Sequence, residues 1–264
     1  MTPEEEDAWA SEASKSLVVP VTERPVDGNV LALSGGADST AMAYELDDRG
    51  VRFTLLFTPT RDELPGVWAH VVRTALAVGA PLVLPTNRTL ADWIDEFDAL
   101  PNYRQRWCTR LIKIEPCIAY LRRHPGSTLL VGLRADEEER QGMYGSHAAY
   151  RFPLRELGWG RPQVIASLRR RGVSVPPRTD CACCPFQRIG EWRDLWRDHP
   201  AAYARAEGYE ERTGHTFRSA QRDTWPAALK DLRREFESGR KIRGDGKVGL
   251  SVVDGEGKCR VCSG

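Results

Sequence analysis

One short stretch of the chain has residue types that suit phosphate binding. An apolar run ends in Ser-Gly-Gly, and an acid and two hydroxyls follow it. These residues are Ser34, Gly35, Gly36, Asp38, Ser39 and Thr40. Glycine lets the backbone turn tightly and lets an anion come close. The helix expected after the turn adds unpaired N–H groups and a positive dipole end. The stretch therefore predicts a phosphate cradle between a strand and a helix.

This turn is not the common nucleotide P-loop. That motif needs a second glycine after four residues, followed by Lys and Ser or Thr, and the turn lacks both. An ordinary strand-to-helix turn would explain the glycines alone. It would not explain the acid and hydroxyl at Asp38 and Ser39, so we favour a phosphate loop of a different class.

Two further segments carry cations, which would stabilise the negative charge of a phosphate group bound at the turn. The candidates are Arg106, Lys113, Arg134 and Arg140. Magnesium prefers oxygen ligands, which Asp38 offers in the turn and Asp136 or Glu137 offers after an apolar strand. The alternative for 134–140 is a solvated charge run, but the apolar residues directly before it favour a site.

Cysteines form a second centre. Of the seven cysteines, two pairs have Cys-x-x-Cys spacing: Cys181 with Cys184, and Cys259 with Cys262. Thiolates at this spacing bind zinc or iron–sulfur clusters. Tetrahedral zinc held by these four would be structural and would fasten the tail to the body. Cys117 is expected to be a small buried apolar residue.

Strands alternate with helices through the first half of the chain. We expect strands at 29–33, 51–57, 81–84 and 127–131, with helices at 40–49, 65–78, 89–97 and 111–123. This order predicts an α/β fold with a Rossmann-like parallel sheet and helices on both faces. Ligands of such sheets bind at the carboxyl ends of the strands, where the segments 34–39, 58–60 and 132–140 lie.

The second half of the chain shows no such alternation, and helices are expected there at 189–197, 201–212 and 225–238. We predict three parts: an N-terminal helix and connector over 1–27, a nucleotide-binding α/β domain over 28–158, and a smaller, mainly helical cysteine-containing region over 159–264. A basic segment at 161–178 is either a solvated surface or a contact for a polyanion.

The overall composition narrows the class of protein. The net charge of +1 argues against coating nucleic acid by charge alone. No apolar run is long enough to cross a membrane, and the acidic N-terminus lacks a signal-peptide pattern, so we expect a cytoplasmic protein without a membrane partner. A homodimer is compatible with the sequence.

Three motifs together resemble the PP-loop ATP pyrophosphatase superfamily, in its phosphoadenylylsulfate (PAPS) reductase-like branch. They are Ser34-Gly35-Gly36-Ala37-Asp38-Ser39, then Arg106-Trp107-Cys108-Thr109 with the following Lys113, then Gly132-Leu133-Arg134-Ala135-Asp136-Glu137 with the following Arg140. This branch includes sulfonucleotide reductases and the PP-loop protein of DNA phosphorothioation systems. The resemblance covers about 29–186.

The resemblance implies a set of functional residues. It implies catalytic roles for Asp38, Ser39, Lys113, Arg134 and Cys108. It implies a nucleotide site formed by Ser34, Gly35, Gly36, Asp38, Ser39, Thr40, Thr58, Arg106, Gly132, Arg134, Asp136 and Arg140. It also brings Cys108 near Cys181 and Cys184, with Cys259, Cys262 or Cys183 as a fourth ligand of a 4Fe–4S cluster. One departure is Ala37, where many relatives carry Lys, so the turn lacks a cation.

The function expected from these features is an enzyme that binds ATP and Mg²⁺. It cleaves ATP to AMP and pyrophosphate to adenylylate an acceptor, and a cluster-bound or cysteine-bound sulfur then replaces AMP. The acceptor is a nucleobase, a nucleic acid or a small metabolite, and a sulfur-donor protein is a possible partner. One alternative is a sulfonucleotide reductase, although the C-terminal Cys-Arg-Val-Cys-Ser-Gly does not match the Glu-Cys-Gly type of those enzymes. Another is a non-catalytic nucleotide- or nucleic-acid-binding protein with structural zinc.

Overall fold

One parallel sheet organises the first half of the chain. The computed structural model describes residues 1–137, 149–175, 179–220 and 222–242. Five parallel strands lie in the order β3-β2-β1-β4-β5. They are β1 (Asn29–Ala32), β2 (Thr54–Leu56), β3 (Leu82–Val83), β4 (Thr128–Leu130) and β5 (Ala149–Arg151). The central strand β1 pairs with β2 on one side and β4 on the other, so the strand order reverses there, where ligands of open α/β sheets bind.

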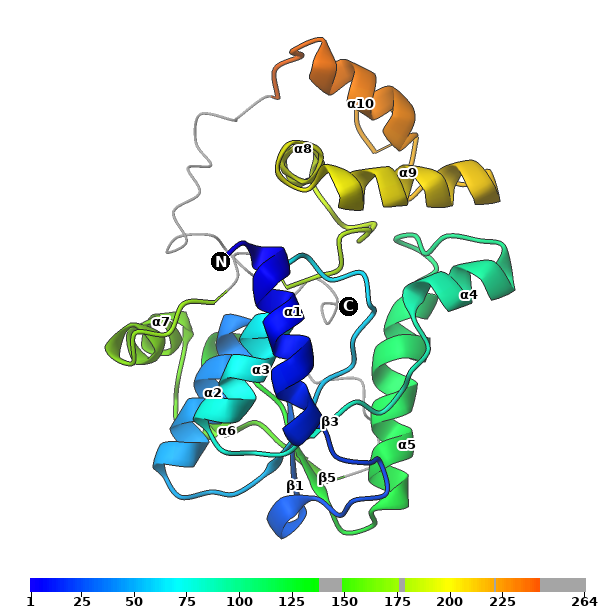
Figure 1. Cartoon of the computed structure of the whole chain (residues 1–264). Coiled ribbons are helices and arrows are strands. Elements are labelled where there is room, and N and C mark those ends of the chain that lie inside the picture. Colours follow the sequence, from blue (N-terminus) through cyan, green and yellow to red (C-terminus); the bar gives the residue numbers. More distant parts are fainter. Residues whose placement is uncertain (138–148, 176–178, 221, 243–264) are drawn as a thin grey trace.

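Helices cover both faces of this sheet, as the alternation of strands and helices predicts (Figure 1). One face packs against α2 (Ala37–Asp48), α3 (Val67–Ala77) and α7 (Arg161–Arg170). The other face packs against α5 (Glu115–Arg123), whose Cys117, Tyr120 and Leu121 contact the strands. A short helix, α6 (Pro153–Glu156), follows β5, and a π-helical segment, Thr109–Ile114, precedes α5. The α/β architecture is therefore confirmed.

The N-terminal helix α1 (Pro3–Ala13) lies along α3 (Figure 1). Thr2 and Glu5 form a capping box at its start. Its Asp7 carboxylate accepts hydrogen bonds from the backbone N–H groups of Gly66 and Ala69, both at 2.8 Å. Because these N–H groups lie at the start of α3, the Asp7 side chain of α1 caps α3.

The C-terminal helices form a second core above the sheet in Figure 1. They are α8 (Ile189–Asp198), α9 (Pro200–Thr213) and α10 (Leu229–Glu237). They share this core with α4 (Leu90–Phe97), which belongs to the first half of the sequence. The side chains of Trp192, Tyr203 and Phe217 are fully buried at its centre. The helical C-terminal region is confirmed.

Several boundaries differ from the sequence prediction. Helix α2 begins at Ala37 and not at Thr40, so Asp38 and Ser39 lie in its first turn. Strand β5 and helix α7 were not predicted, and α7 packs against the α/β core. Thr89 does cap α4, where its hydroxyl accepts from the Asp92 N–H at 3.1 Å. Within the described residues, no helix is long and apolar enough to cross a membrane.

Candidate active site

The turn between β1 and α2 has the form of an anion cradle. Gly35 has φ +77°, a left-handed conformation that favours glycine. Gly36 is the N-cap of α2 and provides no side-chain cap. The Ser39 hydroxyl accepts from the Ser34 N–H at 3.1 Å and lies 3.2 Å from the Gly36 carbonyl oxygen, to which it donates. These hydroxyls thus fix the conformation of the turn, while the first N–H groups of α2 have no side-chain cap.

The end of β4 lies directly against this cradle. A Cβ atom added at Gly132 would lie 3.1 Å from the backbone nitrogen of Ser39 and 3.2 Å from its Cα. Only glycine therefore allows the two segments to approach this closely. Gly132 was predicted as a nucleotide-site residue, and the structure brings it to the same place as Asp38 and Ser39.

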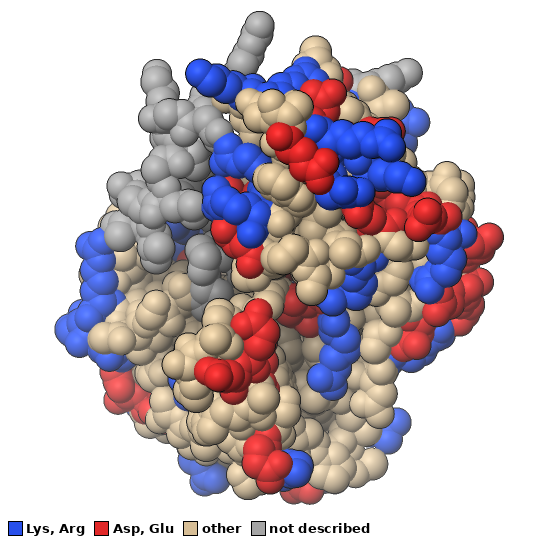
Figure 2. Space-filling view, turned by 45° about the horizontal axis from the view of Figure 1, so that its top comes forward, with Lys and Arg blue, Asp and Glu red and all other residues tan. Residues whose placement is uncertain are grey.

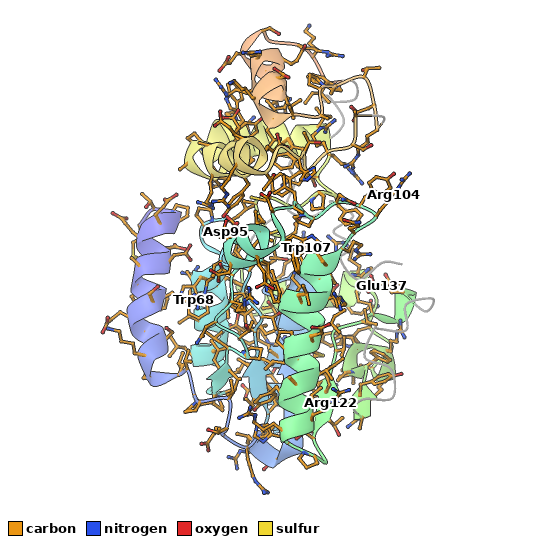
Figure 3. All side chains as sticks on the ribbon, turned by 90° about the vertical axis from the view of Figure 1, so that its right-hand side faces the viewer. Trp68, Asp95, Arg104, Trp107, Arg122 and Glu137 are labelled. Atoms are coloured by element: carbon orange, nitrogen blue, oxygen red, sulfur yellow. The ribbon has the colours of Figure 1, made fainter. Side chains whose placement is uncertain are left out.

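A buried arginine joins the loop after β4 to the start of α2. Arg134 is only 3% exposed. Its guanidinium contacts the Asp38 carboxylate at 2.7 Å and the Asp136 carboxylate at 2.8 Å, and Glu137 lies at 3.7 Å. Figure 3 labels Glu137 in this part of the molecule. Arg134 therefore joins the two predicted carboxylates, Asp38 and Asp136.

Asp38 is unusual within this network. Burial raises the pKa of its carboxyl to about 6, although the charges of Arg134 and Arg161 act in the opposite direction. Its Oδ2 binds Arg134, whereas its Oδ1 is buried without a hydrogen-bond partner. An unpartnered buried carboxylate oxygen is costly. Oxygen ligands are what Mg²⁺ prefers, so this atom suits a magnesium ion bound with a nucleotide.

Thr40 and Thr58 were also predicted as nucleotide-site residues. Thr40 is fully buried, and its hydroxyl is 2.9 Å from Nε2 of His70, so it contacts the core of the domain. Thr58 is half-buried just beyond β2. Arg140 lies outside the described residues.

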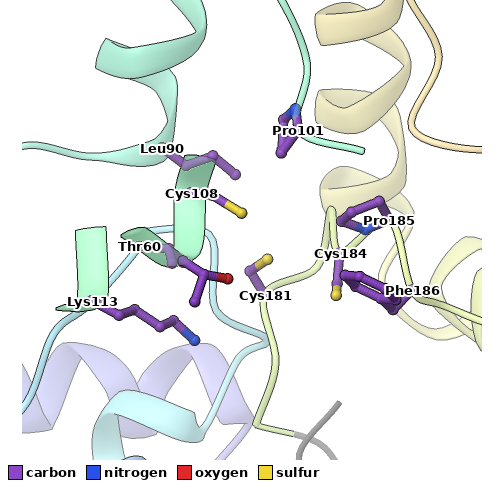
Figure 4. Close-up of a pocket in the computed structure, with 10 residues that line it drawn as sticks. Thr60, Leu90, Pro101, Cys108, Lys113, Cys181, Cys184, Pro185 and Phe186 are labelled. Atoms are coloured by element: carbon purple, nitrogen blue, oxygen red, sulfur yellow. The ribbon is translucent and has the colours of Figure 1, made fainter. Parts of the chain in front are cut away.

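Three cysteines line one pocket, which Figure 4 shows in close-up. Cys108 comes from the segment before the π-helical turn, and Cys181 and Cys184 come from the loop before α8. Thr60, Leu90, Pro101, Thr109, Lys113, Pro185 and Phe186 complete the lining. The Arg106 guanidinium lies over the Phe186 ring, 5.1 Å from its centroid. Arg106 and Lys113 therefore lie beside the thiols.

The thiols of this pocket differ in acidity. A hydrogen bond from Cys181 lowers the pKa of the Cys184 thiol, and the charge of Lys113 also lowers it, whereas burial acts to raise it. The same hydrogen bond and burial raise the pKa of Cys181. Burial raises the pKa of Cys108. Cys184 is thus the thiol with the most thiolate character in the pocket.

The donor set fits a sulfur-ligated metal centre in its chemistry, because thiolates hold iron–sulfur clusters and zinc. In 1–137, 149–175, 179–220 and 222–242, however, no group of three or more Cys, His, Asp or Glu side chains surrounds a common point as a metal would require. Cys259 and Cys262 lie outside these residues. The other two cysteines face elsewhere: Cys183 is buried in the C-terminal core, and burial raises the pKa of Cys117 under the sheet to about 12.

A residue that the sequence analysis missed, Asp62, holds the thiol loop in place. Its backbone carbonyl accepts from the Ala182 N–H at 2.6 Å, and the neighbouring Glu63 forms an antiparallel bridge with Cys181. The buried Asp62 carboxylate binds Arg205 at 2.6 Å and the Tyr209 hydroxyl at 3.1 Å, both on α9. The sequence feature that could have indicated Asp62 is an acidic residue just beyond the end of an apolar strand.

The fold and the cradle together define an α/β nucleotide-binding protein of the open parallel-sheet type. The family model for the phosphoadenosine phosphosulfate reductase domain matches residues 28–145. The match supports the PAPS reductase-like family of PP-loop proteins that the three motifs predict.

Two solved structures are also similar to this chain. One is a phosphate complex of PAPS reductase from Candida auris, with 17% identity, a TM-score of 0.46, and coverage of 66% of this chain and 82% of that one. The other is the U34-tRNA thiolase NcsA from Methanococcus maripaludis with its [4Fe-4S] cluster, with 14% identity, a TM-score of 0.41, and coverage of 87% of each chain. No curated protein matches the sequence.

Proposed function

We propose that this protein cleaves ATP between its α and β phosphates, releases pyrophosphate and adenylylates an acceptor. The observation that carries the proposal is the start of α2. There, uncapped N–H groups, the Ser34 and Ser39 hydroxyls, and the unpartnered Oδ1 of Asp38 meet in one turn. This combination suits a polyphosphate with its magnesium ion.

Each group has a role in that reaction. The N–H groups of α2 would bind phosphate oxygens, and Asp38 would hold a magnesium ion, whose charge would offset that of the leaving pyrophosphate. Arg134 holds Asp38 and Asp136 in position. An oxygen of the acceptor attacks the α phosphorus, its bond to that phosphorus forms, and the bond to the bridging oxygen breaks as pyrophosphate leaves.

The thiol pocket supplies the second half of the proposal. Cys108, Cys181 and Cys184 would hold an iron–sulfur cluster, with Cys259 or Cys262 as further ligand candidates. Such a cluster would supply sulfur for the second step at this pocket. The Lys113 ammonium stabilises negative charge on the Cys184 sulfur. Sulfur bound at these cysteines would be the nucleophile: its bond to the acceptor would form as the bond between the acceptor and the AMP oxygen breaks. Zinc in the same thiols would serve a structural role.

The family match favours one other candidate. A PAPS reductase-type domain over 28–145 suits a sulfonucleotide substrate, with sulfite released by a thiol. The two candidates differ in their product, because only the first releases pyrophosphate from ATP.

Anaerobically purified protein tests the proposal directly. We would incubate it with ATP labelled at the α phosphate, with Mg²⁺ and with mixed tRNA, single-stranded DNA or nucleosides as acceptors. We expect AMP and pyrophosphate from the wild type and at least a hundredfold less from Asp38→Asn. The matched control is Asp47→Asn, an exposed position in the last turn of the same helix. Equal release from wild type and Asp38→Asn would contradict the proposal. Sulfite formed from PAPS, with no pyrophosphate from ATP, would favour the reductase.

A further inference from the structure

The connection between α9 and α10 is built around a buried arginine. It is described over 214–220 and 222–228. The Arg218 side chain is fully buried, and its Nη2 binds both oxygens of the Asp223 carboxylate, at 2.9 and 3.1 Å. Its Nε donates to the Pro226 carbonyl oxygen at 3.2 Å. Because a buried guanidinium is costly unless it is paired, these bonds fix the conformation of the connection.

A carboxylate of α9 holds both ends of this connection. The Glu210 side chain accepts from the Phe217 N–H at 3.0 Å through Oε1 and from the Leu229 N–H at 2.6 Å through Oε2. The Phe217 ring lies in the C-terminal core, with its centroid 6.2 Å from that of Trp192. The connection is therefore a fixed part of the helical region, and it can hold another segment in place.

Arg222 extends from this connection to the loop that carries the pocket thiols. Its Nη1 donates to the Pro185 carbonyl oxygen at 3.0 Å, and its Nη2 donates to the Phe186 carbonyl oxygen at 3.3 Å. On the face of the molecule that Figure 2 shows, basic and acidic side chains lie side by side, so an arginine there is best understood from its individual partners. A guanidinium suits two successive carbonyl groups because its N–H groups form a rigid fork.

The two carbonyl groups belong to the turn that carries Cys184. Cys184, Pro185 and Phe186 are consecutive and all line the thiol pocket (Figure 4). The Pro185 carbonyl and the Phe186 N–H are the two ends of one peptide unit, and this N–H is hydrogen-bonded to the Cys184 thiol. Because a peptide unit is planar, a bond that fixes its oxygen also fixes the direction of its N–H. Arg222 therefore acts on the Cys184 sulfur through one peptide group.

The same loop is held at its start by a different part of the chain. The Asp62 carbonyl accepts from the Ala182 N–H at 2.6 Å, and Glu63 bridges to Cys181. These bonds fix the loop against the strand end after β2. Arg222 fixes the opposite end of the loop against the C-terminal helices, so Cys184 lies between two independent supports.

We propose that Arg222 is a positioning residue of the thiol pocket, which fixes the Cys184 sulfur by binding the carbonyl oxygens of Pro185 and Phe186. The inference rests on the proposed sulfur-transfer function of this pocket, to which it adds a residue of the C-terminal region. Cys184 is only 4% exposed. Without the two bonds from Arg222, the turn 184–186 opens more often and exposes the thiol to reagents in solution.

Alkylation of individual cysteines tests this inference. We would dialyse the reduced full chain against a chelator, treat it with iodoacetamide, and follow each cysteine by peptide mass spectrometry. We expect Arg222→Met to raise the alkylation rate of Cys184 by about 5- to 30-fold, because two charge-assisted hydrogen bonds that close the turn are lost. Cys117 is equally buried, under the sheet, and its rate should change less than twofold. It serves as the internal reference for global unfolding.

Two further variants separate the position of Cys184 from general stability. Arg222→Lys keeps a charged donor for these carbonyl groups, and it should bring the Cys184 rate to within about threefold of the wild type. The matched control is Arg234→Met, which removes an exposed arginine paired with Asp231 on α10. This change should leave the rates of both cysteines as in the wild type.

Three results would overturn the assignment of Arg222. They are an unchanged Cys184 rate in Arg222→Met, equal rises at Cys117 and Cys184, and no recovery in Arg222→Lys. The assay needs neither nucleotide nor acceptor, so its outcome is distinct from that of the ATP-cleavage assay. Absence of pyrophosphate release from a protein whose Cys184 depends on Arg222 would contradict the proposed function alone.

Discussion

The Asp38 carboxylate and the Arg134 guanidinium form a 2.7 Å ion pair that joins the first turn of α2 to the loop after β4. The two residues are 96 positions apart in sequence. The pair is largely buried, with 4% of the Arg134 side chain and 21% of the Asp38 side chain exposed. Arg134 therefore fixes the position of Asp38 relative to the loop after β4.

Replacement of Arg134 should be costly. We expect Arg134→Met to lower the free energy of unfolding by about 3–5 kcal/mol, because it leaves buried carboxylates without a counter-charge. Asp38→Asn should cost only about 1 kcal/mol, because Arg134 keeps its contact with Asp136. Urea denaturation followed by circular dichroism measures both values. The idea fails if Arg134→Met is as stable as the wild type.

Gly132 offers a test of the close contact between β4 and α2. We expect Gly132→Ala to weaken ATP binding by roughly tenfold or more, because its Cβ would press on the Ser39 backbone and shift the start of α2. The control is Gly190→Ala in α8, where an added Cβ meets no atom within 4 Å. That change should leave binding unaltered and raise stability by up to about 1 kcal/mol. Tight ATP binding by Gly132→Ala would contradict the contact.

His70 should make stability depend on pH. Burial lowers its pKa to about 4, against 6.5 for an ordinary histidine, with help from the Arg73 charge and against the hydrogen bond to the Ser174 backbone. The unfolded chain therefore binds a proton more readily than the folded one between about pH 6.5 and pH 4, and the folded state loses stability as the pH falls through that window.

The matched variant for this effect is His70→Gln. Between pH 7 and pH 5, the wild type should lose about 2 kcal/mol more unfolding free energy than the variant does. Glutamine keeps a hydrogen-bonding group near the Thr40 hydroxyl and has no charge to gain. Parallel pH profiles for the two proteins would show that His70 titrates normally in the folded state.

Asp62 connects the two halves of the molecule. We expect Asp62→Ala to cost about 3 kcal/mol of unfolding free energy, because Arg205 and Tyr209 lose a buried partner. The same change should increase the reaction rate of Cys181 and Cys184 with a thiol reagent, since the segment 62–63, whose backbone bonds their loop, is no longer held by α9. Asp95→Ala, which removes an exposed pair with Arg212, should change neither value. Slow thiol reaction in Asp62→Ala would contradict the link.

Asp7 should stabilise α3 from outside that helix. We expect Asp7→Ala to lower the free energy of unfolding by about 1 kcal/mol, the usual value of a helix cap. Glu12→Ala, in the same helix but paired only with the exposed Lys15, should cost less than about 0.5 kcal/mol. Thermal unfolding of the two variants distinguishes a cap from a general effect of charge on α1.

Much of the α/β domain follows from local patterns. The buried strand β1 reads as an apolar run, and the Ser-Gly-Gly turn after it signals both the cradle and the helix start. Strand β5 could not be found in this way, because Ala149, Tyr150 and Arg151 are exposed and have no apolar pattern. Its place in the sheet comes from pairing with β4, which is a tertiary contact.

In the candidate site, too, some residues could be predicted from local motifs and others could not. Asp38, Gly132 and Arg134 were predicted from their motifs, and the structure brings them together. Asp62 was not predicted as a site residue, because its role comes from contacts with segments far away in the sequence. The Cys-x-x-Cys spacing indicated Cys181 and Cys184, but it did not show that Cys183 between them is buried in the other core.

The bridge between Glu63 and Cys181 has a consequence for how the protein is made. It joins the strand end after β2 to a loop more than a hundred residues later, and Cys108 lies between them in the sequence. During synthesis, the sheet strands through β4 emerge before the loop that carries Cys181 and Cys184. The three thiols are therefore separated on the nascent chain, and we expect any sulfur or metal to be loaded only after the C-terminal helices have docked.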